Sequence, residues 1–302
     1  MSSTDQRPAR PFGAVGTAMV TPLSEDGHRV DLDAAQELAA HVVQHGHDLV
    51  VVSGTTGEAP TLTDVEKIDL ARAVVEAVGE RATVVAGVGT YDTAHSIDLA
   101  SAHAEVGVDG LLVVTPYYSK PSQAGVIAHT TAIADSTELP VMLYDIPGRA
   151  GIPLAYETLL RLGENPRIVA VKDAKADLQQ ASLVMERTDL VYYSGEDALN
   201  LPWLAIGAAG MVSVVSQIAG DVERELVDAV DRSDLPAARA ANHRLVPVVE
   251  AIMNRMPGAV AAKAALHLQG VLPHAAMRGP LVPADGTQLR ELEAALDTAG
   301  LL

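Results

Sequence analysis

Eight short runs rich in valine, isoleucine and leucine recur along the first 216 residues. Each run is nearly continuous in apolarity, which is typical of parallel strands covered on both faces. Between the runs lie segments with the spacing of amphipathic helices, such as 33–45, 64–78 and 93–105. Strands are therefore predicted at 16–22, 48–54, 82–89, 110–116, 139–147, 168–174, 190–197 and 210–216.

The alternation of strand and helix has two common outcomes, an open doubly wound sheet or a closed barrel. Eight units in about 200 residues match a (β/α)₈ TIM barrel in count and length. An open sheet usually shows a glycine-rich turn after its first strand. Here the first strand runs into the sequence MVTPLSEDG instead. The α/β fold class predicted is therefore the barrel.

The pattern changes after residue 220. Segments 221–253, 259–270 and 285–302 read as three helices with no strand between them, the last with Asp285 or Thr287 as its N-cap. The predicted organisation is a flexible N-terminal tail over 1–12, the barrel over 13–220, and C-terminal helices packed on the barrel over 221–302.

Composition and charge narrow the function classes. Aromatic residues make up only 3% of the 302, so the core must consist of smaller aliphatic side chains. The formal charge of −18 argues against partners such as nucleic acid or an anionic membrane surface. The absence of cysteine excludes disulfides and thiol chemistry. No apolar stretch is long enough to cross a bilayer, so a soluble cytoplasmic protein is expected.

Candidate chemistry gathers at the predicted carboxyl ends of the strands, where barrels carry function. Lys172 directly follows the apolar run IVAV. It is either a solvated charge at a strand end or an amine held in an apolar pocket. The junctions after the second, fourth, fifth and seventh strands bring further polar groups and small residues to the same rim as Lys172, which favours the pocket. These residues are Thr55, Thr56, Tyr117, Tyr118, Tyr144, Arg149 and Gly195.

A desolvated lysine near positive charge loses its proton more easily and attacks carbonyl carbon, forming a Schiff base. With a 2-oxo acid, loss of a methyl proton then gives an enamine, and a tyrosine can relay that proton. Glycines 54 and 57 let backbone N–H groups approach a carboxylate, and the hydroxyls of Thr55 and Thr56 add donors. The residues thus indicate a Schiff-base aldolase or related lyase acting on a small anionic oxo acid.

Five motifs then identify a resemblance. GTTGE (54–58), TPYY (115–118), YDIPGR (144–149), VKDA (171–174) and SGEDA (194–198) resemble, in order, those of the dihydrodipicolinate synthase family of pyruvate-dependent class I aldolases. The resemblance runs from about residue 13 to 300. It implies condensation of pyruvate with L-aspartate 4-semialdehyde in lysine and diaminopimelate biosynthesis.

The resemblance also implies roles for single residues. Lys172 would form the Schiff base, so no separate cofactor and no metal are expected. Tyr144 would relay protons, linked to Thr55 and to Tyr118 from a neighbouring subunit of a homotetramer built from dimers. Thr56 would hold the pyruvate carboxylate and Arg149 that of the semialdehyde. Gly195 and the carbonyl of Val212 would line the pocket.

Sialic acid and 2-oxo-3-deoxy sugar acid lyases of the same superfamily are the alternative, and Arg149 speaks against them. Two departures from the family pattern stand out. Lysine-sensitive members typically carry His or Asn where this chain has Ala59, Asp64, Lys67 and Tyr91, so feedback inhibition by lysine is predicted to be weak or absent. The segment 256–266 lacks the usual proline-rich turn, and none of its side chains is expected in the site.

Overall fold

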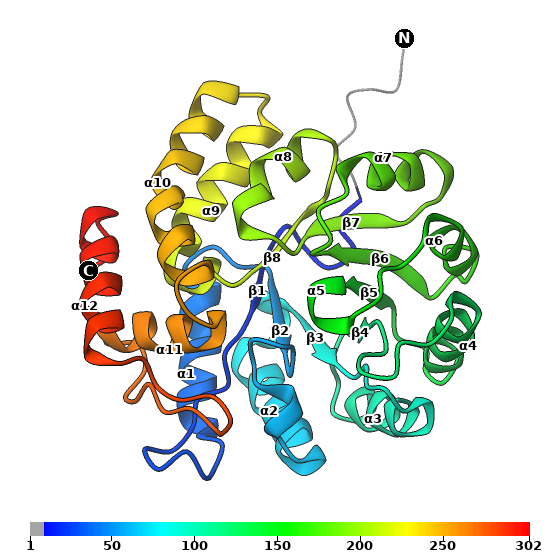
Figure 1. The fold of residues 1–302 in the computed structure, drawn as a ribbon, viewed down its shortest axis with the longest axis horizontal. Helices are drawn as coiled ribbons and strands as arrows, with labels where there is room; N and C mark the ends of the chain where they lie inside the picture. The colour runs from blue at the N-terminus through cyan, green and yellow to red at the C-terminus, as the bar shows by residue number, and fades with distance from the viewer. Residues whose placement is uncertain (1–8) are drawn as a thin grey trace.

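The computed structural model describes residues 9–302 and confirms the closed (β/α)₈ barrel (Figure 1). Each strand pairs in parallel with the next, and β8 pairs with β1 to close the ring. All eight predicted strands are present, each shorter than its apolar run. They are β1 Val15–Ala18, β2 Leu49–Val52, β3 Thr83–Gly87, β4 Gly110–Val114, β5 Val141–Asp145, β6 Ile168–Asp173, β7 Val191–Ser194 and β8 Gly210–Ser213.

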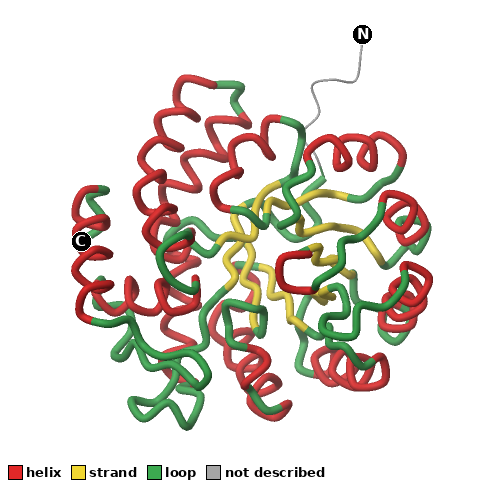
Figure 2. Tube along the Cα trace, viewed as in Figure 1, coloured by secondary structure: helices red, strands yellow, loops and turns green. Residues whose placement is uncertain are grey.

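Helices surround the strands as an outer layer (Figure 2). Side-chain caps begin several of them; the α2 helix, for example, starts with a capping box between Thr63 and Glu66. The helices are α1 Leu32–Gln44, α2 Asp64–Val78, α3 Thr93–Glu105, α4 Gln123–Ala134, α5 Pro147–Ala150, α6 Tyr156–Leu162, α7 Leu178–Arg187, α8 Asn200–Ala205, α9 Ser216–Asp231, α10 Leu235–Met253, α11 Gly258–Leu268 and α12 Gly286–Thr298, with 3₁₀ turns η1 Ala59–Thr61, η2 Gly79–Arg81 and η3 Asp197–Leu199.

The strands are apolar on both faces because alternate residues enter two different cores. Met142 and Tyr144 of β5 belong to the cluster inside the barrel, whereas Val141 and Leu143 pack outward against the helices. In β6 the inward positions are Ala170 and Lys172, and Val171 packs outward. The side chain of Lys172 therefore points into the barrel because of its place in the strand alternation.

The amino end of the barrel is closed by Phe12, which is fully buried. Its backbone N–H donates to the Tyr193 hydroxyl (3.3 Å), and that hydroxyl donates to the Gly13 carbonyl (3.0 Å). Arg10 forms an ion pair with Asp231. Within the predicted tail, residues 1–8 lie outside the described part, while Arg10 and Phe12 are packed against the barrel.

The C-terminal helices gather along one side of the barrel, with α10 beside α9 (Figure 1). The predicted boundary at residue 220 falls inside α9. The predicted single helix over 221–253 is wrong, because the chain breaks at 232–234 into α9 and α10. Asp234 caps α10 and a proline occupies its first turn. Asp285 is the N-cap of α12, one of the two predicted.

None of the helices described is long and apolar enough to cross a membrane.

Candidate active site

A cavity of about 640 Å³ opens at the carboxyl ends of the strands. Of the predicted site residues, it is lined by Thr55, Tyr118, Tyr144 and Arg149. These come from the junctions after β2, β4 and β5 and from the tip of β5 itself. The structure thus brings together side chains that lie up to 94 positions apart in the sequence (149 − 55).

Lys172 lies behind this lining and is only 4% exposed. Its Nζ is 4.3 Å from the centre of the Tyr144 ring, its direct partner in the β5–β6 register. Burial lowers the pKa of the Lys172 amine to about 8; Asp197 opposes this and the Arg149 cation assists it. The interpretation of Lys172 as a solvated surface charge is wrong. Burial increases the fraction of the amine that is neutral and therefore nucleophilic.

Gly195, just after β7, leaves room for that amine. A Cβ added there would lie 3.0 Å from Lys172 Cγ and 3.1 Å from Lys172 Cε. The Lys172 side chain therefore passes directly over the Gly195 backbone. Val212 lies in β8, is 1% exposed and belongs to the same inner cluster as Tyr144. The predicted role of its carbonyl stays a prediction.

Tyr144 is buried, and burial raises its pKa to about 12, while a hydrogen bond with Thr55 and the charge of Arg149 act in the opposite direction. The phenol is therefore protonated at neutral pH and can pass a proton only through hydrogen-bonded neighbours. Thr55 is such a neighbour. A hydroxyl pair of this kind is suited to proton relay between substrate and solvent.

The turn after β2 carries Thr55 and Thr56 in an unusual backbone. Ser53 and Glu58 on either side of the turn both have positive φ, 52° and 57°, a conformation that L-residues adopt only where surrounding contacts hold it. Thr56 is 8% exposed and does not line the cavity itself.

Arg149 and Tyr118 are the two exposed members of the set. Arg149 belongs to the single-turn helix α5 and lines the cavity with an exposed side chain. Tyr118 lines the cavity but is 91% exposed, and its backbone has a positive φ of 66°.

Sequence reasoning missed several residues around the site. Asp197, in the SGEDA motif, is buried. Its carboxylate accepts hydrogen bonds from the backbone N–H groups of Val214 (3.0 Å) and Val215 (3.2 Å), which fixes the end of β8 against η3. Its place in this motif, at the end of the predicted seventh strand, was the signal that the sequence offered. Glu58 and Lys263 form a buried ion pair behind the Thr55–Thr56 turn, a contact across 205 positions that no local pattern could indicate.

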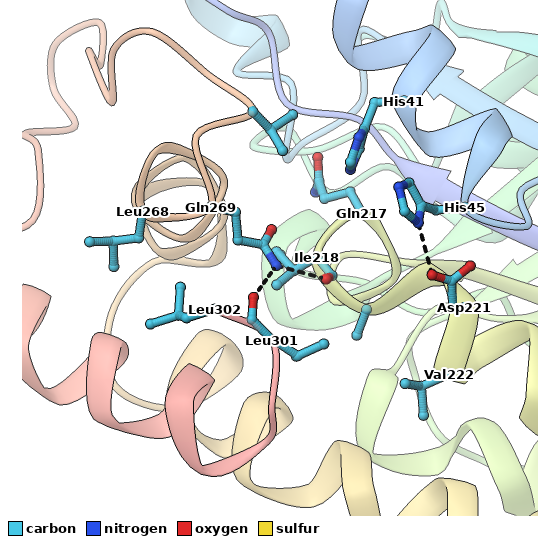
Figure 3. A pocket seen from close by; sticks show the side chains of 13 residues that line it. His41, His45, Gln217, Ile218, Asp221, Val222, Leu268, Gln269, Leu301 and Leu302 are labelled. Carbon is cyan, nitrogen blue, oxygen red and sulfur yellow. Dashed lines mark hydrogen bonds and ion pairs between the residues drawn. The ribbon is translucent and has the colours of Figure 1, made fainter.

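A second, smaller cavity of about 360 Å³ lies between α1, α9 and the C-terminal residues (Figure 3). His41 and His45 line it, with ring centres 4.3 Å apart, and His45 Nδ1 lies 2.8 Å from Asp221. Among residues 9–302, no group of three or more His, Asp or Glu side chains is arranged to hold a metal ion. This cavity brings together none of the predicted site residues.

Comparison with known proteins places this geometry in a family. The model of the dihydrodipicolinate synthetase family matches residues 11–299. A 4-hydroxy-tetrahydrodipicolinate synthase from Kineococcus radiotolerans is 57% identical over 99% of this chain and 97% of its own. One from Mycolicibacterium paratuberculosis is 54% identical over 98% of this chain and 97% of its own.

Among solved structures, the DHDPS from Cyanidioschyzon merolae with lysine bound superposes with a TM-score of 0.94, at 41% identity over 97% of this chain and 99% of that one. The fold and the resemblance predicted from the motifs are both confirmed. This chain belongs to the dihydrodipicolinate synthetase family.

Proposed function

We propose that this chain is a 4-hydroxy-tetrahydrodipicolinate synthase, which condenses pyruvate with L-aspartate 4-semialdehyde. The observation that carries the proposal is the buried Lys172 amine, with its lowered pKa, beside Tyr144 at the carboxyl end of the barrel. The names of the relatives support this synthase reading. They give no support to the alternative, a sialic acid or sugar acid lyase.

Lys172 attacks the C2 carbonyl of pyruvate, and loss of water gives the Schiff base. Its protonated imine accepts electrons as a methyl proton leaves, which gives the enamine. The enamine carbon bonds to the aldehyde carbon of the second substrate. The amino group of that substrate then closes the ring onto the imine carbon and releases Lys172.

The proton transfers pass through Tyr144, because the centre of its ring lies 4.3 Å from the Lys172 amine and its hydroxyl is hydrogen-bonded to Thr55. Thr56 and its turn bind the pyruvate carboxylate through backbone and hydroxyl donors. Arg149 binds the carboxylate of the semialdehyde, and its planar guanidinium suits a bidentate contact. Gly195 and the Val212 carbonyl complete the wall beside the nucleophile.

The reaction needs no separate cofactor, since the covalent electron sink forms on Lys172 itself. The proton relay is completed by Tyr118 of the partner subunit, so the active form is at least a dimer and, by the family resemblance, a homotetramer in the cytoplasm. The 91% exposure of Tyr118 supports a role outside its own chain.

Intact mass after borohydride reduction with pyruvate tests the nucleophile. The wild type should gain one pyruvate-sized adduct, and Lys172→Ala none. Lys67→Ala is the matched control, because Lys67 also lines the cavity and is buried. An adduct retained by Lys172→Ala would contradict the assignment. Turnover of aspartate semialdehyde, assayed alongside, separates the synthase from another pyruvate-dependent aldolase.

A further inference from the structure

Glu58, the last residue of the GTTGE motif, takes no part in the proposed reaction. Glu58 directly follows the Thr55–Gly57 turn, is 4% exposed and does not line the cavity. Its backbone is left-handed, with φ 57° and ψ 30°. Its carboxylate points away from the substrate, toward the C-terminal segment, where Lys263 Nζ lies 2.5 Å from one oxygen and the Arg278 backbone N–H donates to the other at 3.0 Å.

Lys263 belongs to α11 and is 1% exposed, so both members of this ion pair are removed from water. Besides Glu58, its ammonium donates to the carbonyl of Ala276 at 2.8 Å. A buried charge is tolerated only where partners of this kind surround it. Lys263 therefore fixes the position of Glu58 relative to the segment that follows α11.

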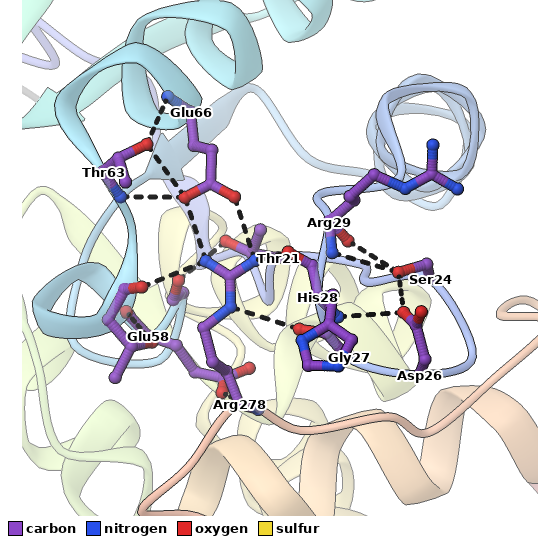
Figure 4. Close-up of polar contacts among 12 residues, drawn as sticks. Thr21, Ser24, Asp26, Gly27, His28, Arg29, Glu58, Thr63, Glu66 and Arg278 are labelled. Carbon is purple, nitrogen blue, oxygen red and sulfur yellow. Dashed lines mark hydrogen bonds and ion pairs between the residues drawn. The ribbon is translucent and has the colours of Figure 1, made fainter.

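Arg278 holds the far end of the loop that begins at Glu58, close to the start of α2 (Figure 4). Its guanidinium donates to both carboxylate oxygens of Glu66, each at 2.9 Å, and to the Thr61 carbonyl at 3.0 Å. It also donates to the carbonyls of Gly27 and His28 in the loop after β1. One side chain thus joins the loops after β1 and β2 and the first turn of α2.

Lys263 of α11 and Arg278 in the segment after it therefore hold the residues between Glu58 and Glu66 at both ends. We call these two residues the clamp. The turn needs such support because Ser53 and Glu58 both adopt the left-handed backbone that L-residues avoid. Thr55 and Thr56 lie between these two positions. A shift of the clamp would move the donors that face the substrate carboxylate.

We propose that Lys263 and Arg278 are positioning residues, which hold the Thr55–Thr56 turn in the conformation that binds the pyruvate carboxylate. This inference rests on the proposed function of that turn. It makes the C-terminal helices part of the structure that sets substrate affinity. The binding of pyruvate and the binding of aspartate semialdehyde can then be tested separately. Arg149 on α5, which binds the semialdehyde carboxylate, makes no contact with the clamp.

The test compares Michaelis constants for the two substrates in Lys263→Met and Arg278→Met. The KM for pyruvate should rise about tenfold or more, and the KM for aspartate semialdehyde should stay within about twofold, because only one carboxylate site is displaced. Arg278 is less buried than Lys263, so its variant carries the test if Lys263→Met does not fold.

Arg10→Met is the matched control. It breaks a part-buried ion pair with Asp231 at the amino end of the barrel, far from the turn. It should lower the melting temperature and leave both Michaelis constants unchanged. If Lys263→Met and Arg278→Met behave in the same way, the clamp is only structural and the inference is overturned. A wild type that forms no pyruvate adduct would overturn the proposed function instead, whatever the variants show.

Discussion

At the scale of the residue, the lowered pKa of Lys172 determines how the reaction should depend on pH. An ordinary lysine has a pKa near 10.5, and burial brings that of Lys172 to about 8. Only the neutral amine attacks a carbonyl, so the reactive fraction falls about tenfold for each pH unit below 8. The rate of borohydride trapping at limiting pyruvate should therefore rise up to about pH 8 and then level off. A rise that continued to pH 10 would show that the amine is not desolvated.

Gly195 provides a second prediction at this scale. Its missing side chain leaves the space that Lys172 occupies, and an alanine Cβ would meet Lys172 Cγ at 3.0 Å and the Asp173 carbonyl at 3.1 Å. Since the carbonyl cannot move without the strand, the lysine has to shift. Gly195→Ala should lower kcat about tenfold or more through misplacement of the nucleophile. Gly286→Ala, at the start of α12, is the matched control, because a Cβ there would meet only Arg290 Nη1, at an ordinary contact distance of 3.6 Å.

At the scale of the element, the starts of α2 and α3 determine the response to lysine. Asp64, Lys67 and His95 meet at the cavity wall, with Lys67 Nζ 3.3 Å and His95 Nε2 2.9 Å from the Asp64 carboxylate. The Lys67 ammonium is already paired with the Asp64 carboxylate, and the same ammonium would repel the side chain of a free lysine. Inhibition of turnover by lysine should therefore be weak or absent. Inhibition of turnover at sub-millimolar lysine would contradict this prediction.

At the same scale, the strands of the barrel were predicted from the sequence, whereas one break between helices was missed. The barrel could be predicted because its strands are buried on both faces. Each strand therefore appears in the sequence as a short apolar run followed by polar residues. Lys172 could be placed in the site because five such ends meet at one rim. The break between α9 and α10 was missed although Asp234 and Pro236 signal it.

The contact between Glu58 and Lys263 could not have been predicted in this way. It joins a turn to a helix 205 positions later, and nothing in the apolar pattern of 256–266 distinguishes a lysine that points inward from one in solvent. The same limit applies to Tyr118. The motif TPYY marks two tyrosines, and only the structure shows that Tyr117 is half-buried while Tyr118 is almost fully exposed.

At the scale of the whole molecule, the exposed ring of Tyr118 could act in the site of its own chain or in the site of a partner subunit. If it completes the proton relay of a partner subunit, Tyr118→Phe should lower kcat by about 10²-fold or more, as expected for loss of a proton-transfer group. The melting temperature should hardly change, because the ring contributes little to the core of its own chain. An unchanged kcat would remove Tyr118 from the mechanism.

Subunit mixing separates a role in the partner's site from a role in its own. Lys172→Ala and Tyr118→Phe are each expected to be nearly inactive as pure proteins. In a mixed dimer, the chain that keeps Lys172 receives an intact Tyr118 from the other chain, so one of the two sites is complete. Because random exchange of equal amounts makes half of the dimers mixed, about a quarter of the wild-type activity should return. If Tyr118 acted within its own chain, no site in any dimer would hold both residues, and mixing would restore nothing.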